Sequence, residues 1–132
     1  MPDNTFEFVV EGPPVPLRAM KKNPKRYREW KQQVYRAAAA SWPKATPPIH
    51  GEDVAVAVTN YYTLAPPDID NILKPILDSM EHLVYYNDNQ VYRVTSVKHN
   101  LAEPVRDPSP AVAAGLALYS ELVHVLVDWN GD

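Results

Sequence analysis

Apolar residues alternate with small or polar residues in several short stretches of the chain. Val54, Val56 and Val58 are separated by alanines, and β-rich residues continue to Tyr62. Such alternation puts every second side chain on one face of a strand, so it predicts a half-buried β-strand. Other β-rich stretches are bounded by the glycines, prolines and asparagines that favour turns. The pattern predicts strands over residues 6–10, 54–62, 91–97 and 123–129.

The longest helical pattern follows Asn23 and Pro24. Asparagine is a good N-terminal cap, and proline suits the first helical position because its missing N–H would have no partner there. Apolar residues then recur every three or four positions as a single stripe, formed by Tyr27, Trp30, Val34 and Ala38. We expect this helix to end near residues 41–43, at a serine and a proline.

A second helix is expected over residues 71–81. Its apolar residues recur with helical spacing and are Ile72, Leu73, Ile76, Leu77 and Met80. Pro75 fits this helix only near its first turn, because a proline deeper in a helix costs about 3 kcal/mol. Residues 111–119 are compatible with a third helix. Strands interspersed with two or three helices predict an α/β or α+β fold with a small mixed sheet.

The composition excludes several classes of protein. The 132 residues include no cysteine, so disulfides and thiolate metal sites such as zinc fingers are excluded, and a reducing compartment fits. No apolar run approaches the roughly 20 residues that span a membrane, and no charged and then apolar leader opens the chain. We therefore expect a single cytoplasmic domain over residues 1–132, with no membrane partner.

The net charge of −3 conceals a strongly basic segment. Residues 18–36 hold eight basic residues and one acidic residue, a net charge of +7, and the rest of the chain carries −10. A cationic segment can follow the backbone of a nucleic acid, although a solvated helix flank is the ordinary alternative. The candidate DNA-binding residues are Arg18, Lys21, Lys22, Lys25, Arg26 and Arg28.

Three acidic residues and a lysine form the candidate catalytic site. Asp68 and Asp70 flank one isoleucine, Lys74 follows in the expected helix, and Asp88 lies in the turn before the next strand. If the two first aspartates end an extended segment, their side chains point to the same side. A βαβ-like connection would bring Asp88 back beside Asp68. Carboxylates without histidine or cysteine suit Mg²⁺ or Mn²⁺ better than Zn²⁺.

Ordinary structural roles are open for the same residues. An aspartate at a helix start is often a cap, and Asp88 between two asparagines is typical of a turn. Asp70, Lys74 and Asp78 are spaced by four, so they would share one face of a helix that begins near Asp70. Asp78 would then be a salt-bridge partner for Lys74.

One long motif resembles the RusA family of Holliday-junction resolvases. It consists of Asp68-Ile69-Asp70-Asn71, Lys74 and Asp78, followed after an apolar gap by Asn87-Asp88-Asn89-Gln90-Val91. The first strand, the turn over residues 12–16 and the basic segment before the helix with Trp30 also match in character. The resemblance covers residues 6–100 approximately.

The resemblance implies a small RusA-like endonuclease that uses Mg²⁺ and acts as a homodimer on four-way DNA junctions. It assigns catalysis to Asp68, Asp70, Lys74 and Asp88, with the three aspartates as metal ligands. Residue 87 is asparagine where the family has a second acid, and residues 65–67 lack the basic groups that some members have. A non-catalytic branched-DNA-binding protein with this fold, or a flap or fork nuclease, are therefore the alternatives.

The last thirty residues carry no part of this motif, so we expect them to be divergent. They either pack on the core or extend a dimer interface. The apolar residues available for either role are Leu116, Leu118, Leu122, Val125 and Val127.

Overall fold

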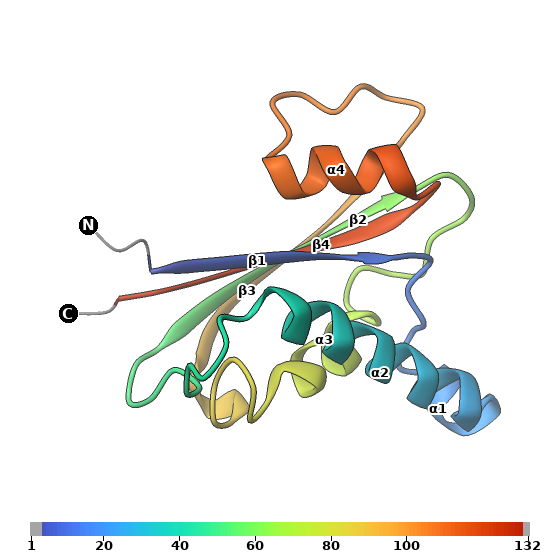
Figure 1. Ribbon diagram of the computed structural model, residues 1–132. Coiled ribbons are helices and arrows are strands. Elements are labelled where there is room, and N and C mark those ends of the chain that lie inside the picture. Colours follow the sequence, from blue (N-terminus) through green and yellow to red (C-terminus); the bar gives the residue numbers. More distant parts are fainter. Residues whose placement is uncertain (1–3, 131–132) are drawn as a thin grey trace.

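A four-stranded mixed sheet forms the centre of the protein in a computed structural model, which describes residues 4–130 (Figure 1). The strands are β1 (Thr5–Glu11), β2 (Val54–Tyr62), β3 (Val91–Asn100) and β4 (Leu122–Trp129). Their order in the sheet is β1-β4-β2-β3. Strands β2 and β3 are parallel, and the other neighbours are antiparallel. The α+β class with a small mixed sheet, expected from the sequence, is confirmed.

The helices lie on both faces of this sheet. They are α1 (Ala19–Lys22), α2 (Pro24–Ser41), α3 (Leu73–Met80) and α4 (Pro110–Leu118), with a 3-10 turn, η1, over Asp88–Gln90. Figure 1 shows α2 and α3 on one face and α4 on the other. None of the helices within residues 4–130 is long and apolar enough to cross a membrane.

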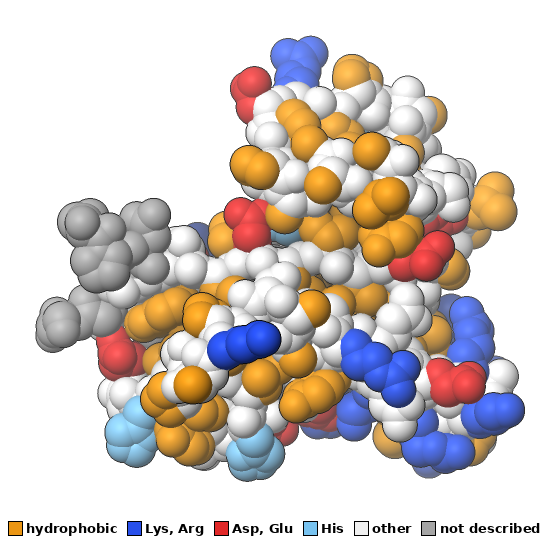
Figure 2. Space-filling view, in the orientation of Figure 1, with side chains coloured by type: hydrophobic (Ala, Val, Ile, Leu, Met, Phe, Trp, Pro, Cys, Tyr) orange, Lys and Arg blue, Asp and Glu red, His pale blue; other side chains and the backbone are white. Residues whose placement is uncertain are grey.

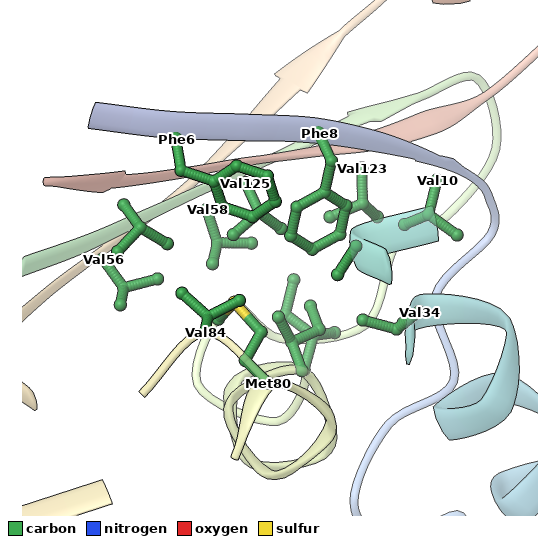
Figure 3. Close-up of a cluster of buried hydrophobic side chains, with 14 of the residues drawn as sticks. Phe6, Phe8, Val10, Val34, Val56, Val58, Met80, Val84, Val123 and Val125 are labelled. Atoms are coloured by element: carbon green, nitrogen blue, oxygen red, sulfur yellow. The ribbon is translucent and has the colours of Figure 1, made fainter. Parts of the chain in front are cut away.

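The main core lies between the sheet and helices α2 and α3. Asn23 caps α2 as expected, since its Oδ1 accepts a hydrogen bond from the Arg26 N–H at 3.2 Å. The predicted stripe of α2 is buried, and Val34 is fully enclosed. Figure 3 shows Val34 facing Phe8 of β1, in a cluster that also contains Met80 of α3. The local apolar patterns therefore predicted the main packing surface correctly.

Helix α3 begins at Leu73, two residues later than the sequence suggested. Pro75 is its third residue, where a missing N–H costs nothing because the first N–H groups of a helix have no intrahelical partner. An earlier start would move this proline out of the first turn. Asp70 consequently lies outside α3, and of the expected stack only Lys74 and Asp78 share the helix.

Helix α4 and the residue before it pack against strand β1. Ser109 caps α4 by accepting a hydrogen bond from the Val112 N–H at 3.3 Å, and it donates one to Glu7 Oε1 of β1 at 2.7 Å. Gly115 allows α4 to approach the sheet closely, because a Cβ there would lie 2.9 Å from Val9 Cγ1. These contacts attach α4 to the face opposite α2 and α3.

Strand β4 lies between β1 and β2, in the interior of the sheet. Leu122, Val125 and Val127 are fully buried within the chain, so they pack on the core and are not free for a dimer interface. Leu118 at the end of α4 is 74% exposed. Of the two roles left open for these residues, the structure supports core packing for the strand.

Candidate functional site

The turn that carries Asp68 and Asp70 is held in place by its backbone. The Asn71 N–H donates a hydrogen bond to the Asp68 carbonyl at 3.0 Å, which closes the turn before α3. The Ser96 hydroxyl of β3 donates to the Ile69 carbonyl at 2.7 Å. The first bond fixes the shape of the turn, and the second attaches it to β3, an edge strand of the sheet.

This turn differs from the extended segment expected from the sequence, so simple alternation does not orient its two carboxylates. The side chains of Asp68 and Asp70 are both exposed. Within residues 4–130 neither carboxylate takes part in a hydrogen bond or an ion pair. Both are therefore accessible to a cation or to a substrate.

Lys74 pairs with Asp78 one helical turn further along α3. Its Nζ lies 3.3 Å from each of the two Asp78 carboxylate oxygens. The hydrogen bond and the charge of Asp78 raise the pKa of the Lys74 ammonium, and the charge of Asp88 acts in the same direction. Lys74 is thus an ammonium paired with Asp78, whose carboxylate lies within 4.8 Å of that of Asp88.

Three carboxylates gather next to this lysine. Asp78, Glu81 and Asp88 each offer an oxygen within 4.8 Å of the other two, and Asp88 is exposed. The Asp88 N–H also donates a hydrogen bond to Glu81 Oε2 at 3.2 Å. Hard divalent cations prefer carboxylate oxygens, so this donor set fits Mg²⁺ or Mn²⁺.

Gln90 holds the η1 turn that presents Asp88. Its amide nitrogen donates hydrogen bonds to the carbonyls of Ile49 at 2.9 Å and Glu52 at 3.1 Å. Its amide oxygen accepts from the backbone N–H groups of Tyr86 at 2.9 Å and Asn87 at 3.3 Å. The glutamine of the motif therefore has a structural role, which the sequence alone did not reveal.

Within residues 4–130, the structure brings Asp88, but neither Asp68 nor Asp70, into a group of carboxylates within 4.8 Å of one another. The turn of Asp68 and Asp70 is attached to β3 at Ser96, the sixth residue of that strand. Asp88 precedes the first residue of β3. Within residues 4–130, the carboxylates gathered around Asp88 are those of Asp78 and Glu81. A single metal site formed by all three predicted aspartates therefore stays a prediction.

Basic side chains line grooves on two sides of these acidic groups. Lys31 and Arg36 of α2 border a groove of about 460 Å³ whose opposite wall includes Asp78 and Glu81. Lys31 also lies 5.8 Å from the centre of the Tyr27 ring. Figure 2 shows Lys and Arg side chains gathered over α1 and the start of α2. Two basic residues of α2 therefore share a groove with Asp78 and Glu81.

A second groove, of about 500 Å³, adjoins the turn of Asp68. Its basic lining residues are Arg18, Lys22 and Arg26, and its opposite wall is formed by residues 65–67. The other three predicted DNA-binding residues are exposed but line neither of these two grooves, and they are Lys21, Lys25 and Arg28.

Comparison with known families assigns the chain. The family model described as endodeoxyribonuclease RusA matches residues 17–106, about two thirds of the chain. The chain belongs to the RusA family. This match contains the whole acidic motif, the basic segment and the βαβ unit from β2 to β3. No curated protein sequence matches the chain.

Membership of the RusA family makes this chain an endodeoxyribonuclease of the class that resolves Holliday junctions. RusA nucleases depend on divalent metal ions, and the carboxylates around Asp88 are consistent with that requirement. Glu81 was not among the residues singled out in the sequence. Its spacing of three from Asp78 was the available signal, because residues three apart are neighbours on a helix.

The pair of Lys74 and Asp78 makes a titration prediction. Asp78→Asn is expected to lower the pKa of Lys74, because both the hydrogen bond and the charge that raise it are weakened. The Lys74–Asp78 pair stabilises the folded protein fully at pH values below the unfolded-state pKa of lysine, about 10.4. This stabilisation is lost as the pH rises through the folded-state pKa of Lys74. Since Lys74 is 58% exposed, we expect a loss below about 1 kcal/mol at neutral pH.

NMR titration of the Lys74 side chain between about pH 8 and pH 12 measures this effect. Glu29→Gln is the matched control, because Glu29 is an exposed acid on α2 without an ion pair within residues 4–130. An unchanged Lys74 titration in Asp78→Asn would contradict the assigned pairing.

Proposed function

We propose that this protein is a Mg²⁺-dependent RusA endonuclease, also active with Mn²⁺, that resolves four-way junctions during DNA recombination and repair. One arrangement carries the proposal. Inside the RusA motif Lys74 pairs with Asp78, whose carboxylate lies within 4.8 Å of that of Asp88, and cation-lined grooves lie on both sides. The cytoplasmic location expected from the sequence is part of the same proposal.

Within this proposal, Asp68, Asp70 and Asp88 hold the metal ion, as the RusA motif implies. Asp78 and Glu81 lie within reach of Asp88 and increase the negative charge around it. The chemistry that a bound Mg²⁺ or Mn²⁺ ion would supply is activation of a water molecule and neutralisation of charge on the scissile phosphate.

The protein's own side chains have two further tasks in the reaction. Lys74 is cationic at neutral pH, and Asp78 and Asp88 raise its pKa further, so it offers a positive charge to the attacked phosphate. The basic residues of α1 and α2 contact DNA phosphates and position the arms of the junction without reading their sequence. Catalysis and positioning are thus carried by different parts of the βαβ unit and its flanking helix.

Cleavage of a labelled four-way junction tests the proposed function directly. The full chain is incubated with the junction or a matched linear duplex in Mg²⁺, Mn²⁺ or EDTA. We expect paired nicks in opposite strands, on the junction only and with metal only. Because paired cuts need two sites, the protein is proposed to act as a homodimer, and light scattering should find two copies on each junction.

Each of the other outcomes would contradict one part of the proposed function. A shifted band without product in either metal would support the non-catalytic DNA-binding alternative. Cleavage of flaps or forks at an equal or higher rate would support the flap or fork nuclease alternative. A single copy bound to the junction would contradict the homodimer.

A further inference from the structure

The groove next to Asp68 differs from an ordinary surface depression in its composition. It has a volume of about 500 Å³, and its lining contains no acidic residue. Five prolines contribute to its walls, from the segments 13–16 and 65–67. Proline has no backbone N–H, so these walls offer few main-chain donors to an anion. Recognition of an anion here depends mainly on the basic side chains.

Those side chains come from one short segment of the chain. Arg18 precedes α1, Lys22 ends it and Arg26 lies in the first turn of α2, and all three line the groove. Within residues 4–130 none of their side chains forms a hydrogen bond or an ion pair. Three cations without an internal partner are thus directed to one narrow surface.

The groove ends at the turn that carries the candidate catalytic aspartates. The Leu17 N–H, next to Arg18, donates a hydrogen bond to the Asn71 carbonyl at 2.7 Å. Asn71 closes the turn through its own hydrogen bond to Asp68. On the other wall, Pro67 immediately precedes Asp68. A strand lying in the groove would therefore run directly to these aspartates.

We infer that this groove binds the sugar–phosphate backbone of the cleaved DNA strand, on one side of the scissile phosphate. Arg18, Lys22 and Arg26 hold the phosphates next to the cut and fix its position, whereas Lys21, Lys25 and Arg28 add only general attraction to DNA. The inference rests on the proposed function, and it divides six residues that the sequence treated alike into two groups.

Two triple variants of the full chain test this division. Arg18→Ala/Lys22→Ala/Arg26→Ala removes the groove cations, and Lys21→Ala/Lys25→Ala/Arg28→Ala removes the same charge from the same segment outside the groove. Junction binding is measured in EDTA and cleavage in Mg²⁺, on junctions with one neutral methylphosphonate at successive positions. Lys44→Ala is the control for the loss of an exposed lysine far from the groove. Lys44 lies beyond the far end of α2, a helix about 27 Å long.

We expect the groove variant to cleave roughly 100-fold more slowly than wild type. The slope of its log binding constant against log salt concentration should become shallower by about 0.9 for each lost phosphate contact. Methylphosphonates at one to three positions beside the cut should weaken wild-type binding but not weaken the groove variant further. The outer variant should lose about tenfold or less, and every methylphosphonate should still affect it as in wild type.

Equal losses in the two triple variants, or a methylphosphonate effect that persists in the groove variant, would overturn the inference. Thermal unfolding of each variant tests whether it is folded. If the groove variant unfolds, the single variants Arg18→Gln, Lys22→Gln and Arg26→Gln replace it. A wild-type protein that cleaves nothing would defeat the proposed function instead. In that case the binding measurements in EDTA still decide whether the groove holds one strand.

Discussion

Asp70→Asn is expected to abolish cleavage of a four-way junction while junction binding stays equal or becomes tighter. In the proposed function Asp70 is a metal ligand, and its exposed carboxylate forms no hydrogen bond or ion pair within residues 4–130. Loss of metal-assisted catalysis removes several kcal/mol of transition-state stabilisation, which corresponds to roughly a 1,000-fold slower cut. Removing a negative charge near the phosphates favours binding.

Single-turnover cleavage in Mg²⁺ and gel-shift titration in EDTA separate these two effects. Asp53→Asn is the matched control, because Asp53 is an exposed aspartate before β2 that lies outside the acidic groups. It should cleave at the wild-type rate. Wild-type cleavage by Asp70→Asn would remove Asp70 from the catalytic set and with it the assignment based on the motif.

Asp88→Asn is expected to have an equally large effect and also to weaken metal binding. Within residues 4–130, Asp88 is the one proposed metal ligand that also belongs to the group formed with Asp78 and Glu81. Its loss also withdraws a charge that raises the pKa of Lys74. Mn²⁺ affinity, followed by paramagnetic broadening of nearby NMR signals, should fall together with the cleavage rate. Tight Mn²⁺ binding by Asp88→Asn near the wild-type affinity would contradict this role.

A comparison of Asp68→Asn with Glu81→Gln identifies the other residues that hold the metal. If the motif aspartates are the ligands, Asp68→Asn should lose as much cleavage as Asp88→Asn. Glu81→Gln should then lose roughly 10- to 100-fold, as residues around a metal site commonly do. The reverse order would assign the metal to the carboxylates gathered by α3 and η1.

Elements set by local pattern were predictable from the sequence. The cap at Asn23, the apolar stripe of α2 and the alternation of β2 each depend on residues within a few positions of one another. Pro75 limits how early α3 can begin, because proline is acceptable only in the first turn, and the helix starts at Leu73 rather than near residue 71. The parallel pairing of β2 with β3 followed from the helix between them.

Contacts between distant residues were not predictable in this way. The apolar run of β4 predicts a strand, but its place between β1 and β2 depends on pairing across more than sixty residues of chain. The same applies to α4, which is attached to the sheet by the hydrogen bond from Ser109 to Glu7. Leu122 and Val125 looked equally suitable for a core and for a dimer interface until that pairing buried them.

By itself, the sequence determined the chemistry of the site: carboxylates and a lysine in the RusA motif, next to a basic segment, without cysteine. The tertiary structure decided which of these groups meet. It brought Glu81 to Asp88, gave Gln90 its anchoring role, and separated the groove cations from their neighbours in the sequence. The physical reason is that residue type and spacing are local properties, whereas proximity depends on how the chain returns along the sheet.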